Sequence, residues 1–194
     1  LKSIGDVAAL GEATLSKIFG SDGATLWHRA IGEDDSPVRS DRGPQKSVSR
    51  EQTFEEDVGD FERLYGTLSY LSEKVADDLR KENSAAKTIT LKIRYADFKS
   101  ETHARTLPTP TRDDRVIFGT AREILLAHYR RRVRLRLLGI AVSGLTGEHW
   151  QLDLLETEKS EAQARLNASL DKIRERYGFT SILRAESLEK RKKK

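Results

Sequence analysis

The feature that most constrains the fold is the strict alternation of side chains in residues 88–95, TITLKIRY. Apolar residues occupy every second position, with mostly hydroxyl or basic residues between them: Ile89, Leu91, Ile93 and Tyr95 alternate with Thr90, Lys92, Arg94 and Ala96. Successive side chains of an extended strand point to opposite faces of a sheet. One face can therefore pack against helices, while the other presents donors that hold phosphate oxygens. The segment predicts a sheet with one buried face and one open, basic face suited to a nucleic acid.

The segments around this strand predict an α+β domain with the element order βαββαβ. A turn near residues 97–101 leads into a second strand, which Pro108 and Pro110 are expected to end. The other elements have helical spacing or strand-like composition: strands over 46–54 and 133–145, and helices over 60–81 and 113–129. A change of phase near Leu137 and Leu138 predicts a β-bulge or a late strand start. This order is typical of a ferredoxin-like split βαβ fold, a four-stranded antiparallel sheet with two helices on one face.

The segments on either side of this domain differ from it in composition. Residues 1–35 predict short helices, with Ser3 as an N-cap and Gly20 and Gly32 as helix ends. The chain is thereby divided into a helical unit over 1–35, a linker over 36–45, the sheet domain over 46–147, a short peptide over 148–157, an amphipathic helical tail over 158–185 and a basic, disordered tail over 186–194.

Composition narrows the classes of function. The 194-residue chain has a formal net charge of only +4, with a sequence pI of about 9.3, so an anionic partner must meet a local basic patch. Cysteine is absent and the four histidines share no metal-ligand spacing, so we expect no metal and no cofactor in this chain. No apolar run approaches the roughly 20 residues that span a bilayer, which predicts a cytoplasmic protein without a membrane partner. The sequence shows no catalytic constellation.

The basic strand faces are the first candidate site. Serines between basic residues let backbone N–H groups approach phosphates, and such contacts orient a duplex without reading its sequence. The residues concerned are Lys46, Ser47, Ser49, Arg50, Lys92, Arg94 and Arg105. An ordinary solvated sheet surface is the alternative, because Glu51 and Glu101 interrupt the positive charge. Residues 130–136 contain five arginines, for which two interpretations remain open: they keep the chain soluble, or they flank bound DNA.

A second candidate site is the peptide QLDLL, residues 151–155, which follows the last strand. Spaced leucines after a glutamine suit recognition of a peptide in a groove, where leucines fill an apolar pocket and the amide makes oriented hydrogen bonds. In the alternative, Leu152, Leu154 and Leu155 pack on their own domain or begin the helical tail. The pattern by itself leaves both interpretations open.

Six segments, in order, carry a resemblance to a known family: SIGDVAAL, FGSDGATLWHRAIGEDDSPV, KSVSREQTF, TITLKIRYADF, ARTLP and RLLGIAVSGL. From Ser3 to Leu145 the chain resembles the C-terminal part of Y-family translesion DNA polymerases of the DNA polymerase IV type. The resemblance implies that residues 1–35 are the latter half of a thumb and that residues 46–147 form the little finger, which grips DNA. The palm and fingers, with the metal-binding carboxylates and their Mg²⁺, would lie upstream of Leu1. We therefore expect this chain alone to be inactive.

The resemblance also assigns residues to contacts. The family's little finger sets its sheet in the major groove and touches phosphates of both strands. By motif position, these contacts would come from Ser47, Ser49, Arg50, Arg94, Thr102, Arg105 and Thr106. Family members also carry a glutamine–leucine peptide that binds the bacterial sliding clamp. Here that peptide would consist of Gln151, Leu152, Leu154 and Leu155, with Leu155 in place of the usual phenylalanine.

The predicted parent is thus a DNA-directed DNA polymerase for lesion bypass in the bacterial cytoplasm, associated with the nucleoid. Its predicted partners are duplex or primer–template DNA and the sliding clamp. One alternative is a non-catalytic, clamp-tethered mutagenesis adaptor of the same superfamily. Another is a ferredoxin-like RNA-binding module, which would carry stacking aromatics on its sheet, whereas Tyr95 falls on the apolar side. A purely structural protein-interaction domain is the third.

Overall fold

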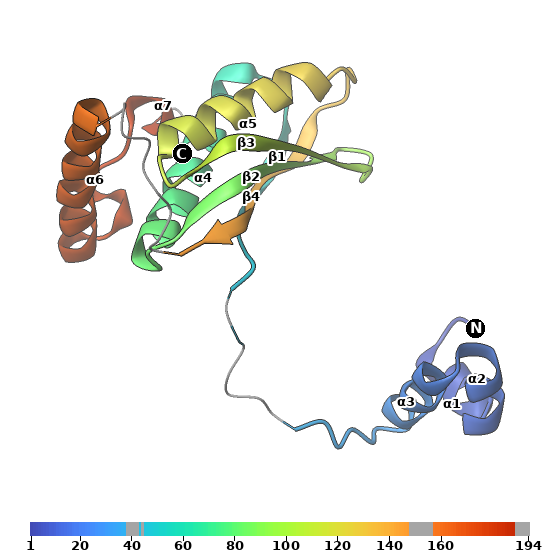
Figure 1. Cartoon of the computed structure of the whole chain (residues 1–194). Helices are drawn as coiled ribbons and strands as arrows, with labels where there is room; N and C mark the ends of the chain where they lie inside the picture. The colour runs from blue at the N-terminus through green and yellow to red at the C-terminus, as the bar shows by residue number, and fades with distance from the viewer. Residues whose placement is uncertain (38–42, 44, 148–156, 189–194) are drawn as a thin grey trace. The chain divides into compact units, whose positions relative to one another are not determined.

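The computed structural model describes residues 1–37, 43, 45–147 and 157–188, which belong to two compact units, Leu1–Gly43 and Pro44–Lys194 (Figure 1). In the first unit, α1 (Ile4–Ala9), α2 (Glu12–Phe19) and α3 (Ser21–Ala30) follow one another closely. Ser3 caps α1, as predicted: its hydroxyl accepts a hydrogen bond from the Asp6 N–H, and the Asp6 carboxylate accepts one from the Ser3 N–H.

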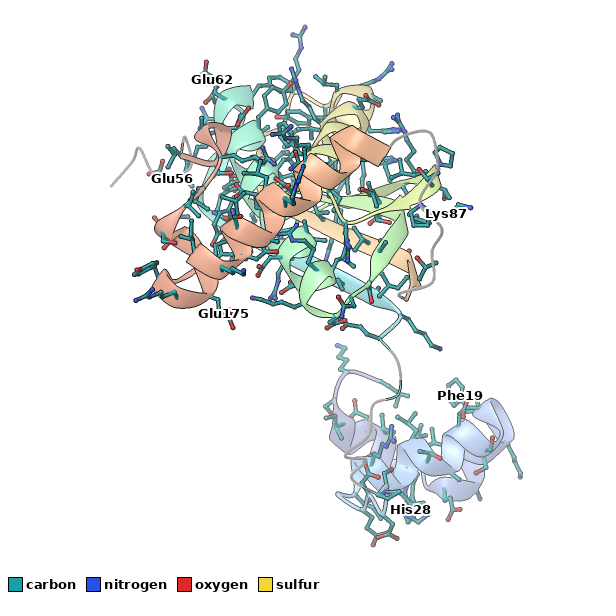
Figure 2. The ribbon with its side chains drawn as sticks, turned by 60° about the vertical axis from the view of Figure 1, so that its left-hand side comes forward. Phe19, His28, Glu56, Glu62, Lys87 and Glu175 are labelled. Atoms are coloured by element: carbon teal, nitrogen blue, oxygen red, sulfur yellow. The ribbon has the colours of Figure 1, made fainter. Side chains whose placement is uncertain are left out.

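Helices α2 and α3 approach so closely that a side chain at Gly23 would overlap the backbone of Leu15: a Cβ atom there would lie 2.1 Å from the Leu15 carbonyl oxygen. The Trp27 indole donates a hydrogen bond of 3.1 Å to the Ala8 carbonyl, which ties α3 to α1. Leu15 is buried, but Phe19 projects from the end of α2 and is largely exposed (Figure 2).

The second unit contains the predicted βαββαβ domain. Its elements are β1 (Ser47–Val58), α4 (Phe61–Lys81), β2 (Ala85–Tyr95), β3 (Ser100–Thr111), α5 (Asp114–His128) and β4 (Leu135–Thr146). The four strands are antiparallel in the order β1-β4-β2-β3, so each βαβ unit is split by one strand of the other. Both helices pack on one face of the sheet (Figure 1). The predicted α+β fold class is confirmed.

The core between the sheet and the two helices follows the alternation of β2. Ile89, Leu91, Ile93 and Tyr95 are fully buried against α4 and α5. Asp60 and Asp113 start the two helices by accepting hydrogen bonds from N–H groups of the first turn. Burial raises the pKa of Tyr95 to about 12, so its phenol keeps its proton and donates a hydrogen bond to Glu101.

Strand β3 differs from the prediction. It continues through Pro108 and Pro110 to Thr111, so the expectation that these prolines end the hairpin is wrong. Proline lacks an N–H donor and is tolerated on an edge strand or in a bulge. β3 is an edge strand, and its register with β2 shifts next to the prolines, between Ala86 and Thr88. In β4 the register with β2 shifts beside Arg136, close to where the phase change predicts an irregularity.

The C-terminal part of the unit packs on the helical layer. α6 (Thr157–Tyr177), the 3-10 helix η1 (Phe179–Ser181) and α7 (Ala185–Leu188) follow β4 along the chain, and α6 lies beside α4 (Figures 1 and 2). Residues 186–188, predicted as part of a disordered tail, instead belong to α7. The reason is that Ser187 is fully buried and donates a hydrogen bond of 2.5 Å to the Glu73 carboxylate of α4.

Charged side chains hold this C-terminal segment in place. Arg80 of α4 forms two hydrogen bonds, of 2.6 and 2.7 Å, with Asp171 of α6. Arg174 of α6 is buried against Glu73, and Arg184 forms an ion pair with Asp114 of α5. Among the residues described, no helix has both the length and the hydropathy needed to cross a membrane.

Candidate nucleic-acid interface

The face of the sheet away from the helices, which we call the open face, consists of four rows of four residues. Strand register defines the rows as Ser47–Ser143–Thr88–Thr106, Ser49–Ala141–Thr90–Ala104, Glu51–Gly139–Lys92–Thr102 and Thr53–Leu137–Arg94–Ser100. On both edge strands these side chains are exposed. Most are serine, threonine, alanine or glycine, so a ligand can come close to the backbone.

Glu51 and Lys92 form a bridge across the open face. The Lys92 ammonium lies 2.8 and 2.9 Å from the two carboxylate oxygens of Glu51, although β4 separates their strands. Gly139 makes this possible, because a Cβ atom at this position would lie 2.7 Å from the Glu51 Cγ. The Glu51 side chain therefore crosses β4 above Gly139. The bridge links three strands and offsets the charge of Lys92.

Arg94 supplies the open face with a cation that no carboxylate of the described residues offsets. Its Nε donates a hydrogen bond of 3.0 Å to the Ser100 hydroxyl on β3. Within the described residues, its guanidinium forms no ion pair with an acidic side chain. Ser100 thus orients the group, while its remaining donors are available to an anion.

Arg50 and Arg105 lie on the opposite side of the sheet. They pair in register with Ile140 and Ile89, whose side chains point into the core. Arg50 forms an ion pair of 2.7 Å with Asp78 of α4, and Arg105 forms one with Glu123 of α5. Both arginines are on edge strands, and about half of each side chain is exposed: 50% and 45%.

The structure therefore separates the predicted DNA contacts into two groups. The open face brings together Ser47, Ser49, Lys92, Arg94, Thr102 and Thr106. Lys46 precedes β1 and is exposed. Arg50 and Arg105 stand at the two edges on the helical side, each beside a carboxylate. The predicted clamp residues Gln151, Leu152, Leu154 and Leu155 lie outside the described residues.

The arginine-rich connection between α5 and β4 contacts the turn of the β2–β3 hairpin, residues 95–100. The Arg131 guanidinium lies 2.6 Å from the Asp97 carboxylate and 4.4 Å from the centre of the Tyr95 ring. This pairing lowers the pKa of Asp97. Arg136 lies 4.7 Å from the centre of the Phe98 ring. The sequence predicted a turn near residues 97–101 but did not single out Phe98 as a candidate site residue, although an aromatic residue in a polar turn was a visible signal.

Three further arginines of this connection, Arg130, Arg132 and Arg134, are exposed and form no ion pair with any described residue. The described part of the chain also brings together no group of three or more histidine or acidic side chains that could hold a metal ion. The open face thus combines hydroxyl groups with the Arg94 guanidinium, and these are donors of the kind that anions accept hydrogen bonds from.

The fold and the matching family model define the class of protein. Residues 45–154 match the C-terminal domain of the impB/mucB/samB family, so the chain belongs to that family. Its relatives include DNA polymerase IV of Desulfatibacillum aliphaticivorans, 38% identical over 185 residues, and DNA polymerase IV of Caulobacter vibrioides, 33% identical over 192 residues. These alignments cover 94% and 98% of this chain, but only 46% and 47% of the relatives.

The chain thus spans about half the length of the relatives it matches, and it corresponds to the C-terminal, little-finger region of a Y-family polymerase of the DNA polymerase IV type. The predicted resemblance is confirmed. The helical segment over 157–188 continues beyond the match to the family model but lies within the alignment with DNA polymerase IV of Clostridium acetobutylicum, which is 31% identical and covers 100% of this chain and 49% of the relative.

Proposed function

We propose that this chain is the DNA-holding part of a lesion-bypass DNA polymerase, and that its open face grips the backbone of duplex or primer–template DNA without reading the sequence. The row of Thr53, Leu137, Arg94 and Ser100 carries the proposal, because it holds an oriented guanidinium that pairs with no carboxylate of the described part of the chain. The parent's palm would supply Mg²⁺ and polymerisation, on the nucleoid in the cytoplasm. This chain alone would supply neither.

The chemistry of the open face supports backbone contacts over base contacts. None of its four rows contains an aromatic side chain, so bases have no platform for stacking there, as an RNA-binding sheet would provide. Hydroxyls, arginine and lysine bind phosphate oxygens, which carry no sequence information. Arg50 and Arg105 would add contacts from the sheet edges, each exchanging its carboxylate partner for a phosphate.

Replacing Arg94 tests this proposal. Arg94→Ala should weaken binding to several unrelated duplexes by about 3- to 10-fold, and to the same degree for each, because a phosphate contact is lost. Arg105→Ala should have a smaller effect, since Glu123 already offsets that charge. Fluorescence anisotropy with labelled duplexes measures the affinities of both variants. Arg176→Ala is the matched control, because it removes an exposed arginine from α6, which is not part of the open face. Loss of binding to one sequence alone would show base readout and contradict the proposal.

We also propose that the peptide QLDLL tethers the parent to the sliding clamp through Gln151 and the three leucines. The double variant Gln151→Ala/Leu154→Ala should weaken binding to the clamp by about 30-fold, as expected when central anchors of a small interface are removed. Asp153→Ala, in the same segment, should change it little. Surface plasmon resonance on immobilised clamp gives both values. Unchanged binding in the double variant would mean that the leucines pack on their own chain.

A further inference from the structure

Phe98, at the turn between β2 and β3, adopts a backbone conformation that bulky residues avoid. Its φ is +63°, and its side chain is 65% exposed. Within the described residues, Asn83 is the other non-glycine residue with a positive φ, and asparagine tolerates this region far better than phenylalanine. Such strain persists where the surroundings impose it, and it is concentrated at functional sites. An exposed ring gains little burial to offset it.

The surroundings fix the turn from two sides. The Phe98 N–H donates to the Tyr95 carbonyl and the Tyr95 N–H donates to the Lys99 carbonyl, each at 2.9 Å. From the neighbouring connection, the Arg134 carbonyl accepts a hydrogen bond of 2.9 Å from the Ala96 N–H. The ion pair of Arg131 with Asp97 holds the same turn. The backbone is therefore held in a conformation that presents the ring to solvent.

The charges beside the ring favour a nucleic acid as its partner. The Arg136 guanidinium lies 4.7 Å from the ring centre, and Arg132 nearby in the chain is exposed and forms no ion pair with the residues that the structure describes. Two carboxylates of this region are engaged with arginines: Asp97 forms an ion pair with Arg131, and Asp57 lies 3.8 Å from Arg136 and partly offsets its charge. Aromatic rings combined with arginines are the usual means of holding unpaired bases.

Continuity with the open face indicates where such a base would be. Arg94 and its partner Ser100 form the last row of the open face, and Ser100 is two residues from Phe98. A duplex whose backbone contacts Arg94 would pass next to the turn, so a junction with a single strand at this row would bring the first unpaired bases beside Phe98. A single-stranded template beyond a primer terminus has bases free to stack on a ring at this place.

We propose that Phe98 is a stacking contact for an unpaired base of single-stranded DNA that continues from the duplex on the open face. This inference rests on the proposed function, because the open face must hold the adjoining duplex. Phe98 therefore adds preference for a junction between duplex and single strand, which the aromatic-free open face cannot supply.

The variant Phe98→Asn separates the binding role of the ring from its effect on folding. Asparagine accepts the positive φ, so the melting temperature should rise by about 2–4 °C. Affinity for a duplex with a short single-stranded overhang should fall by about 5- to 30-fold, while affinity for the blunt duplex should stay within about twofold. Calorimetry and fluorescence anisotropy on the full chain measure the two effects. Phe98→Leu, which keeps an apolar side chain without a π-face, should also lose the preference for the overhang.

The possible outcomes separate this inference from the proposed function. Equal affinities of wild type and Phe98→Asn for the overhang substrate would overturn it, as would an equal loss on both substrates. A lower melting temperature of Phe98→Asn would also overturn it, because the ring would then support the fold. Arg94→Ala should lower the affinity for both substrates to the same degree. If it lowers neither affinity, the proposed function is wrong, whatever the result for Phe98.

Discussion

The affinity of this chain for duplex DNA should fall by about 10²- to 10⁴-fold when the monovalent salt concentration rises from about 50 to about 200 mM. The reason is that each phosphate neutralised by a lysine or arginine releases condensed counterions. Roughly 4–8 such contacts fit the open face together with the basic residues at its edges. With a formal net charge of only +4, the protein as a whole exerts a weak field. The salt dependence would therefore report on local contacts of the basic residues.

Arg94→Ala sharpens this measurement. Removing one phosphate contact should reduce the slope of log affinity against log salt by about one. Arg105→Ala should reduce this slope less. Arg105 can bind a phosphate only by giving up its ion pair with Glu123, so its contact with DNA contributes less to the release of counterions. Anisotropy titrations at four or five salt concentrations give each slope. A flat salt response of the wild type would contradict electrostatic binding by the open face.

The elements whose pattern is local could be predicted from the sequence. Alternation in residues 88–95 indicates β2 and its buried face, and each of the four large apolar residues of that stretch is in the core. The helical spacing over 60–81 predicts α4 to within one residue of its start. These predictions succeed because the pleat and the helical turn impose fixed periods on side chains that must be buried.

The assignment of Arg50 and Arg105 to the predicted DNA contacts shows what an inference from motif position does not resolve, namely on which face of the sheet a side chain lies. Ser49 and Arg50 are adjacent in one strand, as are Arg105 and Thr106, so each pair must divide between the two faces of the sheet. Alternation alone therefore predicts that Arg50 and Arg105 leave the open face if the serine and the threonine occupy it. The structure shows this division and adds the partners Asp78 and Glu123.

Contacts between distant segments could not be predicted from local patterns. Gly139 makes room for the Glu51 side chain only because β4 lies between β1 and β2. The order of strands in a sheet cannot be predicted from the spacing of apolar residues within any one segment. Likewise, Glu73 has the polarity of a solvated helix residue, yet it is 1% exposed, because the chain's C-terminal segment covers it. Its partner, Arg174, is 101 residues away.

The buried pair of Glu73 and Arg174 leads to the largest expected change in stability. Arg174→Ala should lower the free energy of unfolding of the second unit by about 3–5 kcal/mol, the range for removing one partner of a buried ion pair. The Glu73 carboxylate would keep the hydrogen bonds donated by Ser187 and by the Arg184 backbone N–H, but it would be buried without its ion-pair partner. The contact of the Arg174 guanidinium with the Phe179 ring, at 4.4 Å, would be lost as well.

Urea unfolding followed by circular dichroism measures this change, with Arg176→Ala as the control from the same helix. Arg176 is exposed, forms no ion pair with a described residue and lies 5.3 Å from the centre of the exposed Tyr177 ring, so its removal should lower stability by less than about 0.5 kcal/mol. The double variant Glu73→Leu/Arg174→Leu should recover much of the loss, because two apolar side chains need no counter-charge in this site. If Arg174→Ala behaves like Arg176→Ala, water reaches Glu73 in solution, and the C-terminal helices do not seal α4. A large loss that the double variant reverses would instead show that the folding unit extends to α7, about 34 residues beyond the match to the family model.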